Sequence, residues 1–465
     1  MALDSDERPN KPIAKFESML KTDDIYFFDA EDFEDIIHHY LNNGKISLAK
    51  KAIKISLKQH PDSIQLKLLD VEVMVFENNF DAAEKLLDKL QLLDPSNEEI
   101  YIQRANILSK KDNHEGAIKL LNKALELSND SFDIHSLLGM EYLFMDDFKM
   151  AKKSFIHCVN FDEQDYSALY NVIYCFEFLE DYEGAIVYLN DYLDRNPYCE
   201  VAWHQLGKQY FSKKMFTEAL SAFDFAIISD DNFIGAYFEK GKVLEKLGRY
   251  QEAIDNYKTT IKIEDPTSHA FLRIGKCYEK LDNYDMAKYY YYQTVHEDPL
   301  LDKGWLAITN FYFQRKKYDK ALYYINKALN IDGESPTYWK KCALINAQLK
   351  NYDQANFAYK QAVDLGNYEL ETWLNWSNIT ALNKEYTAAL QILEQGKQFY
   401  PDSAEINYRI PGLYLRSQDT INARISLIDA LKDNFKAFTI FKEEFPEYSE
   451  TLWTQEIVDS ILKKP

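Results

Sequence analysis

The sixth copy of an internal repeat reads EVAWHQLGKQYFSKKMFTEALSAFDFAIISDDNF and spans residues 200–233. Its alanine recurs every 34 residues, twelve times, with no insertion or deletion between copies. The full set is Ala49, Ala83, Ala117, Ala151, Ala185, Ala219, Ala253, Ala287, Ala321, Ala355, Ala389 and Ala423. A fixed period of this length is typical of stacked repeat architectures, in which one extended array takes up most of the chain.

Other columns of the repeat explain its period. With the alanine at position 20 of each 34-residue unit, position 24 is large and apolar in all twelve, position 17 is aromatic in nine, and position 8 is Gly, Ala or Ser in seven. Positions 4, 7, 8 and 11 share one face of a first helix, and positions 17, 20, 24 and 27 share one face of a second. A proline at position 32 in five units ends the second helix. The pattern therefore predicts helical hairpins that bury their apolar faces by stacking.

These columns resemble the tetratricopeptide repeat (TPR) pattern, in which W-x2-L-G-x2-Y is followed by A-x3-F and then by P. The sixth unit carries the matching residues Trp203, Leu206, Gly207, Tyr210, Ala219, Phe223 and Ala226. The resemblance covers residues 30–437. It implies an all-α fold: a right-handed TPR superhelix (an α-solenoid) of about twelve helix-turn-helix repeats with terminal capping helices. In such a fold the first helices line a concave groove.

Segments outside the array are expected to close its two ends, because terminal repeats need a cap. Residues 1–29 are predicted to hold a disordered tail and an N-terminal capping segment; a self-peptide in the groove, or a docking segment, is the alternative. Residues 30–437 form the twelve TPR units, and residues 438–465 the C-terminal capping helices. Pro411 occupies position 8 of the twelfth unit, inside a predicted helix, where we expect a kink.

The composition narrows the class of partner. The formal net charge of −21 argues against nucleic acid and against an anionic membrane surface, which the chain would repel. The five cysteines are odd in number and contain no CxxC pair, so neither a disulfide framework nor a zinc site is predicted. The first residues lack the apolar core of a secretory signal, and no apolar run approaches the roughly 20 residues of a membrane helix. We therefore expect an acidic protein of the cytoplasm.

In the TPR family, positions 2, 5, 6, 9, 12 and 13 of the first helix face the groove. In the early part of the array these positions form an apolar zone, and its side chains either pack between helices or bind a ligand. The residues of this early zone are Leu68, Val75, Phe76, Ile102, Met140, Leu143, Phe144, Tyr170, Tyr174 and Phe178. The candidate ligand-binding residues of the whole groove are Tyr170 and Tyr174 of this early zone; His204, Lys208, Lys242, Arg273 and Lys276 of a charged middle zone; and Asn310, Lys340, Asn375 and Arg409 of a mixed late zone.

Three of these candidates form a lysine ladder, since Lys208, Lys242 and Lys276 stand at position 9 of consecutive units. As a binding feature, the ladder would receive acidic side chains or a C-terminal carboxylate. The alternative is a solvated face that is neutralised by neighbouring glutamates.

A TPR subclass that clamps the C-terminal carboxylate of a chaperone is partly matched near the end of the array. Lys340, Asn375 and Arg409 fit its pattern, whereas Leu344 and Glu405 stand where Asn and Lys are expected. Glu405 would repel the carboxylate that such a clamp holds.

Catalytic motifs are absent from the sequence. It contains no HExxH, GxSxG, P-loop or GxGxxG, and the adjacent His38 and His39 would point about 100° apart on a helix. We therefore expect a non-enzymatic scaffold or adaptor that binds a partner protein or peptide in its concave groove, with no cofactor and no metal. The alternative is a peptide-binding chaperone or co-chaperone that recognises acidic or C-terminal carboxylate segments through the lysine ladder.

Overall fold

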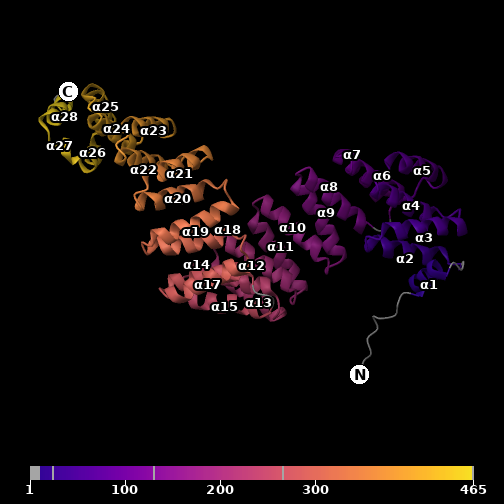
Figure 1. Ribbon diagram of the computed structural model, residues 1–465. Coiled ribbons are helices and arrows are strands. Elements are labelled where there is room, and N and C mark those ends of the chain that lie inside the picture. Colours follow the sequence, from indigo (N-terminus) through magenta and orange to yellow (C-terminus); the bar gives the residue numbers. More distant parts are fainter. Residues whose placement is uncertain (1–10, 23–25, 129–130, 264–266, 463–465) are drawn as a thin grey trace. The chain divides into compact units, whose positions relative to one another are not determined.

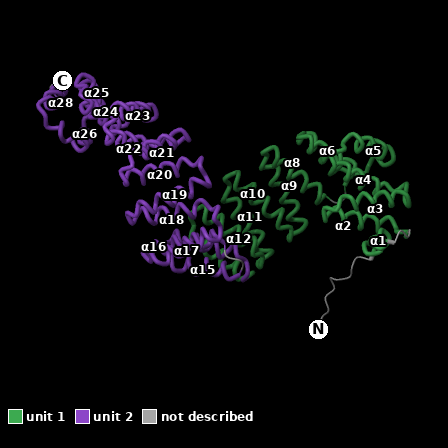
Figure 2. The backbone as a smooth tube through the Cα atoms, viewed as in Figure 1, with its two compact units in different colours: residues 1–230 green, residues 231–465 purple. Residues whose placement is uncertain are grey.

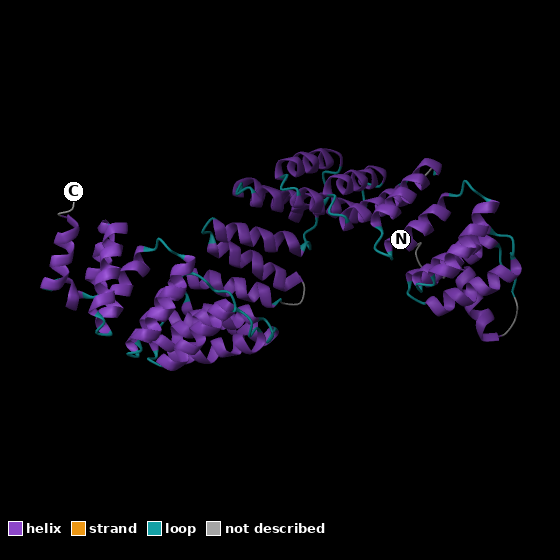
Figure 3. Cartoon of the chain, turned by 90° about the horizontal axis from the view of Figure 1, so that it is seen from above, coloured by secondary structure: helices purple, strands orange, loops and turns teal. Residues whose placement is uncertain are grey.

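The computed structural model describes residues 11–22, 26–128, 131–263 and 267–462, and all regular structure in these ranges is helical (Figure 3). The chain divides into two compact units, unit 1 (residues 1–230) and unit 2 (residues 231–465) (Figure 2). Within the described ranges, none of the helices combines the length and apolar character needed to cross a membrane. The predicted all-α fold is confirmed.

The helices of unit 1 follow one another along the chain in the order of their labels in Figure 1. They are α1 (Lys11–Thr22), α2 (Ala30–Asn42), α3 (Ile46–Gln59), α4 (Ile64–Phe76), α5 (Phe80–Leu93), α6 (Glu98–Ser109), α7 (His114–Leu127), α8 (Phe132–Phe144), α9 (Phe148–Phe161), α10 (Tyr166–Phe178), α11 (Tyr182–Arg195), α12 (Glu200–Ser212) and α13 (Phe216–Ser229).

The helices of unit 2 continue the same alternation and end in shorter elements. They are α14 (Ile234–Lys246), α15 (Tyr250–Ile263), α16 (Ser268–Lys280), α17 (Tyr284–Glu297), α18 (Asp302–Gln314), α19 (Tyr318–Ile331), α20 (Pro336–Gln348), α21 (Tyr352–Asp364), α22 (Leu370–Leu382), α23 (Tyr386–Phe399), α24 (Ala404–Arg416), α25 (Thr420–Asp433), a 3-10 turn (Phe435–Ala437), α26 (Phe438–Glu444), α27 (Pro446–Ser449) and α28 (Leu452–Leu462).

The repeat columns become the core of the helix pairs. Within each unit, a first helix packs on the second helix of its own pair, as α12 does on α13. From α4 to α12 and from α16 to α24, each first helix also packs on the second helix of the preceding pair, as α12 does on α11. All twelve alanines at position 20 have no exposed surface, and all twelve large residues at position 24 are buried. The alanine column therefore works as predicted: a larger side chain there would push two helices apart.

Positions 8 and 24 of a pair are matched in size. Where position 8 is glycine, position 24 is aromatic, as in Gly139 and Phe155; a Cβ built on Gly139 would lie 2.6 Å from the Phe155 ring. Where position 8 is larger, position 24 is aliphatic in seven of eight pairs, as in Val71 and Leu87, which are both fully buried; the exception is Ala343 with Tyr359. The interior of a pair is thus filled because a small residue at position 8 leaves room for a large ring at position 24.

A second periodic feature is a left-handed residue at position 15, which ends each first helix. It is glycine at Gly44 and Gly248 and another residue in the other ten units, with φ between 53° and 65°. These ten residues are Asn78, Asp112, Asp146, Glu180, Lys214, Asp282, Lys316, Lys350, Lys384 and Gln418. In this turn the N–H of the αL residue and the N–H of the residue after it donate to carbonyls of the last helical turn, as those of Lys316 and Lys317 do to Phe313 and Tyr312, and the chain turns into the second helix.

Both ends of the described chain are covered by apolar contacts. Phe16 of α1 is fully buried and its ring lies 6.4 Å from that of Phe33 on α2. At the other end, Phe445 packs so closely on α24 that a Cβ on Gly412 would lie 2.2 Å from its ring. A capping role for these segments stays a prediction, and the predicted disordered tail falls on residues 1–10, outside the described residues. Helix α24 runs through Pro411 to Arg416, and the bend expected at Pro411 also stays a prediction.

The five cysteines are free and buried. Burial raises the pKa of Cys175 to about 11 and that of Cys277 to about 12. These thiols therefore act as small apolar side chains of the core.

Candidate functional site

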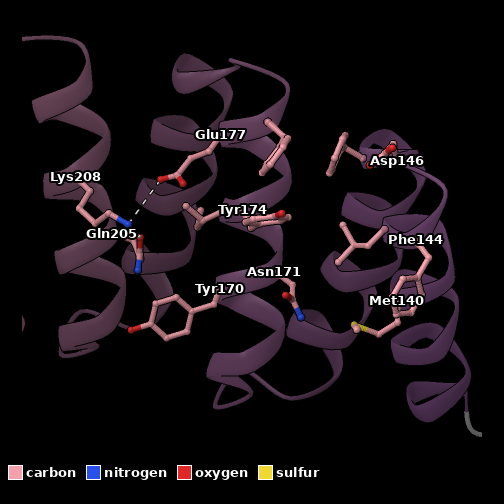
Figure 4. A pocket seen from close by; sticks show the side chains of 13 residues that line it. Met140, Phe144, Asp146, Tyr170, Asn171, Tyr174, Glu177, Gln205 and Lys208 are labelled. Atoms are coloured by element: carbon pink, nitrogen blue, oxygen red, sulfur yellow. Dashed lines mark hydrogen bonds and ion pairs between the residues drawn. The ribbon is translucent and has the colours of Figure 1, made fainter. Parts of the chain in front are cut away.

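A hollow of about 620 Å³ lies in unit 1 between three first helices, α8, α10 and α12. Figure 4 shows Tyr170 and Tyr174 of α10 between residues of α8 and residues of α12. Its lining is Met140, Leu143, Phe144, Asp146, Phe148, Tyr170, Asn171, Ile173, Tyr174, Glu177, Phe178, Gln205 and Lys208. Six of these belong to the early apolar zone, so the family's groove positions here form a real concavity.

Aromatic rings form one wall of the hollow. The ring of Phe178 stacks on that of Phe148 with centroids 4.6 Å apart, and it also lies 4.6 Å from the ring of Tyr174. Despite these contacts, Tyr174 is 44% exposed and Phe178 is 56% exposed. Rings that hold one another in place and still face solvent are typical of a surface that awaits a partner.

On the α8 side of the hollow, Phe144 packs against a hydrogen-bonded histidine–glutamate pair. The Nδ1 of His114 lies 2.8 Å from the Oε2 of Glu141, which is buried, and the His114 ring stacks on Phe144 at 5.0 Å. Phe144 itself is 60% exposed. His114 stands where position 17 usually carries an aromatic residue, and its stacked ring restricts the movement of Phe144.

A small polar network forms the opposite rim. The Nε2 of Gln209 donates to the Oε1 of Glu177 at 2.8 Å, and the Nζ of Lys208 lies 3.8 Å from the same oxygen. Lys208 also donates to Gln205 at 3.3 Å. The rim is therefore polar, and its lysine is already engaged within the chain, while the aromatic wall is apolar.

The other residues of the early apolar zone divide into two kinds. Leu68, Val75 and Ile102 are buried, so they pack between helices, which was the alternative given for this zone. Phe76 is exposed and lies under the Nζ of Lys110, 5.5 Å from its ring centroid.

The middle zone is divided between the two units. Lys208 belongs to unit 1, whereas Lys242 and Lys276 belong to unit 2. Lys242 pairs with Glu239 at 2.7 Å. Loss of hydration, and then the charge of Arg273, lower the pKa of Lys276.

The other two candidates of the middle zone also contact their own chain. Arg273 pairs with Glu245 at 3.2 Å, and the ring of His204 packs 5.8 Å from that of Phe223 inside its helix pair. His204 does not line the hollow.

The late zone is engaged in the same way. The Nζ of Lys340 lies 2.6 Å from both Glu369 and Glu371, and Arg409 pairs with Glu444 of α26. Asn310 and Asn375 are half-buried on α18 and α22. Two of the three residues that fit the carboxylate clamp therefore hold carboxylates of the chain itself.

The sequence reasoning missed two half-buried carboxylates in unit 1. Glu72 stands at position 9 of α4, and Glu99 stands at position 2 of α6. Burial raises the pKa of both carboxyls, and the charge of Glu99 raises that of Glu72 further. The groove register itself was the signal that could have identified them, since both occupy groove positions.

Comparisons with known proteins give the family. Models described as tetratricopeptide repeat match residues 77–141, residues 269–300, and residues 132–165 together with 234–265. A comparison with curated protein sequences finds no match.

Several solved structures resemble the chain. The APC/C hetero-tetramer Cut9–Hcn1 is 14% identical with a TM-score of 0.40, over 89% of this chain and 92% of that one. Yeast Tom70 is 15% identical with a TM-score of 0.40, over 94% and 99%. The C-terminal part of a TPR protein from Cytophaga hutchinsonii is 16% identical with a TM-score of 0.44, over 51% and 99%. With helix pairs in a 34-residue register and family matches in both units, the chain is a tetratricopeptide repeat protein.

Proposed function

We propose that this protein is a non-enzymatic scaffold or adaptor, and that it binds a segment of a partner protein on the concave side of unit 1. The observation that carries the proposal is the aromatic hollow between α8, α10 and α12, whose rings are held against one another and are still exposed. A hollow of about 620 Å³ has room for a few side chains of a peptide.

The packing of the hollow favours binding energetically. Phe148, Phe178 and Tyr174 hold one another in fixed positions, so little side-chain entropy would be lost when a partner covers them. Aromatic anchors in a desolvated centre contribute most of the affinity in typical interfaces, and the polar rim around Glu177 fits the usual border of such a centre.

The alternative, a chaperone-type receptor for acidic or C-terminal segments, has less support. Its cations Lys208, Lys242, Lys340 and Arg409 all lie close to carboxylates of the chain itself. An acidic ligand would have to displace these partners, and that exchange of one carboxylate for another gains little. Lys208 and Lys242, two of the three ladder residues, are therefore better explained as parts of a neutralised face.

The proposal includes no catalysis and no cofactor. The sequence offers no catalytic motif, and in the described residues no group of three or more His, Cys, Asp or Glu side chains is arranged to hold a metal ion. Buried free thiols fit a reducing compartment, which agrees with the cytoplasm expected from the sequence.

Quantitative pull-down from the source cells, read by mass spectrometry, tests the proposal. The groove variant is Tyr170→Ser/Tyr174→Ser. The matched control is Val187→Ser/Ile228→Ser, because these residues are 61% and 74% exposed on the second helices α11 and α13 of the same unit. We expect proteins captured by the wild type and the control to be lost from the groove variant. Equal capture by all three proteins would refute the proposed site.

A further inference from the structure

Three carboxylates stand on consecutive first helices of unit 1, Glu72 on α4, Glu99 on α6 and Asp133 on α8. Helix α4, which carries Glu72, contacts both α2 and α6, and α6 carries Glu99. Asp133 lies in the first turn of α8, the first helix that lines the aromatic hollow. The concave side thus changes from acidic to aromatic between α4 and α10.

In the described part of the chain, this cluster of carboxylates has His38 nearby but no lysine or arginine partner. No lysine or arginine in the described ranges lies within ion-pairing distance of Glu72 or Glu99, in contrast to the paired cations of the later groove. Burial is the main cause of the raised pKa values of both carboxyls; Asp133 and Glu98 raise that of Glu99 further, and His38 lowers both. Two half-buried carboxylates that repel each other are unfavourable unless a positive group joins them.

A buried amide oxygen of Gln103, which is bonded to the cluster, also lacks a hydrogen-bond donor among the described residues. Gln103 is 4% exposed, and its Nε2 donates to the Oε1 of Glu99 at 2.8 Å. Its Oε1 is buried and has no hydrogen-bond partner. Turning the amide over would place that oxygen against the Glu99 carboxylate, so the observed orientation is the favourable one. A buried acceptor without a donor costs about 1–3 kcal/mol, and an incoming N–H donor would remove this penalty.

We infer that the partner segment presents a lysine or arginine side chain to Glu72, Glu99 and Gln103, next to an aromatic or large aliphatic residue that fills the hollow. The inference rests on the proposed function, whose partner class it narrows. The ligand is a basic segment because its cation supplies several N–H donors to the two carboxylates and to the unpaired amide oxygen, and because the opposite charges attract.

Selection from a phage-displayed library of random dodecapeptides against the full-length chain tests this inference. We expect the selected peptides to be enriched in Lys or Arg close to an aromatic or large aliphatic residue. Glu72→Gln/Glu99→Gln removes two charges without changing side-chain size and should weaken binding of a selected peptide about tenfold or more. The matched control Glu115→Gln/Glu126→Gln makes the same charge change on the second helix α7 and should bind as the wild type does.

The outcomes separate the inference from the proposed function. Neutral or acidic selected peptides, or equal binding of a basic peptide to both Gln variants, would overturn the inference alone. Calorimetric binding of Ca²⁺ by the free chain, abolished in Glu72→Gln/Glu99→Gln, would also overturn it, because the carboxylates would then form a metal site. Selected peptides that bind Tyr170→Ser/Tyr174→Ser as tightly as the wild type would overturn the proposed function.

Discussion

The size match between positions 8 and 24 makes a sharp prediction for Gly139→Ala. The new Cβ would lie 2.6 Å from two carbons of the Phe155 ring, about 1 Å inside a normal contact, and Phe155 is buried, so its ring cannot move away freely. Overpacking of this kind costs about 1–3 kcal/mol, and a severe contact falls in the upper half of that range. Alanine recovers about 1 kcal/mol of helix propensity. We therefore expect a net destabilisation of about 1–2 kcal/mol.

A repeat array need not unfold in one step, so the assay should report local stability. Hydrogen exchange of peptides from α8 and α9, compared with peptides from α2 and α3 as an internal reference, gives the local free energy of opening. Adding Phe155→Leu recreates the pairing of Ala105 with Leu121 in the preceding unit, and a coupling energy above about 1 kcal/mol is expected. If Gly139→Ala alone protected α8 as well as or better than the wild type, the size-matching argument would be wrong.

Three further predictions follow from other parts of the structure. Glu180 ends α10 with φ of 53°, so Glu180→Gly should stabilise that helix pair by about 1 kcal/mol, seen as slower hydrogen exchange in α10; faster exchange would contradict this. His114→Phe restores the aromatic residue typical of position 17 but leaves the buried Glu141 unpaired, so thermal unfolding should show a loss of about 1–3 kcal/mol in stability. The double variant His114→Phe/Glu141→Leu should recover most of this stability, and a single variant as stable as the wild type would refute the role of the pair. The raised pKa of Glu99 means that this carboxyl binds a proton more tightly in the folded state than in the unfolded state. Protonation of Glu99 therefore stabilises the fold fully below the unfolded pKa of about 4.3, and this stabilisation is lost as the pH rises through the folded pKa. Glu99→Gln should therefore raise Tm at pH 7 and leave it nearly unchanged at pH 4, and an equal rise at both pH values would refute the assignment.

The fold could be predicted because its information is local and repeated. Twelve copies of an alanine at one position leave no doubt about the register, and every one of these alanines is buried. The left-handed residues at position 15 could not be predicted, because Glu180 and Lys214 carry no chemical mark of that conformation. There the backbone geometry of the hairpin overrides residue preference.

The candidate site could be predicted only in part. The register identified Tyr170, Tyr174 and Lys208, and these three residues line one hollow. It did not reveal that Lys340 and Arg409 are held by carboxylates from 29 to 35 residues further along the chain. Such pairs depend on how neighbouring helices present their side chains, and a column of residue types does not contain that information.

Photo-crosslinking from inside the hollow tests the central claim most directly. A p-benzoylphenylalanine replaces Tyr174 in one variant and Val187, on the second helix α11, in another, and both proteins are irradiated in the source cells. The account predicts a covalent adduct to a discrete partner protein from Tyr174 and none from Val187, with the attached peptide containing Lys or Arg. No adduct from Tyr174, or the same adducts from both positions, would contradict it.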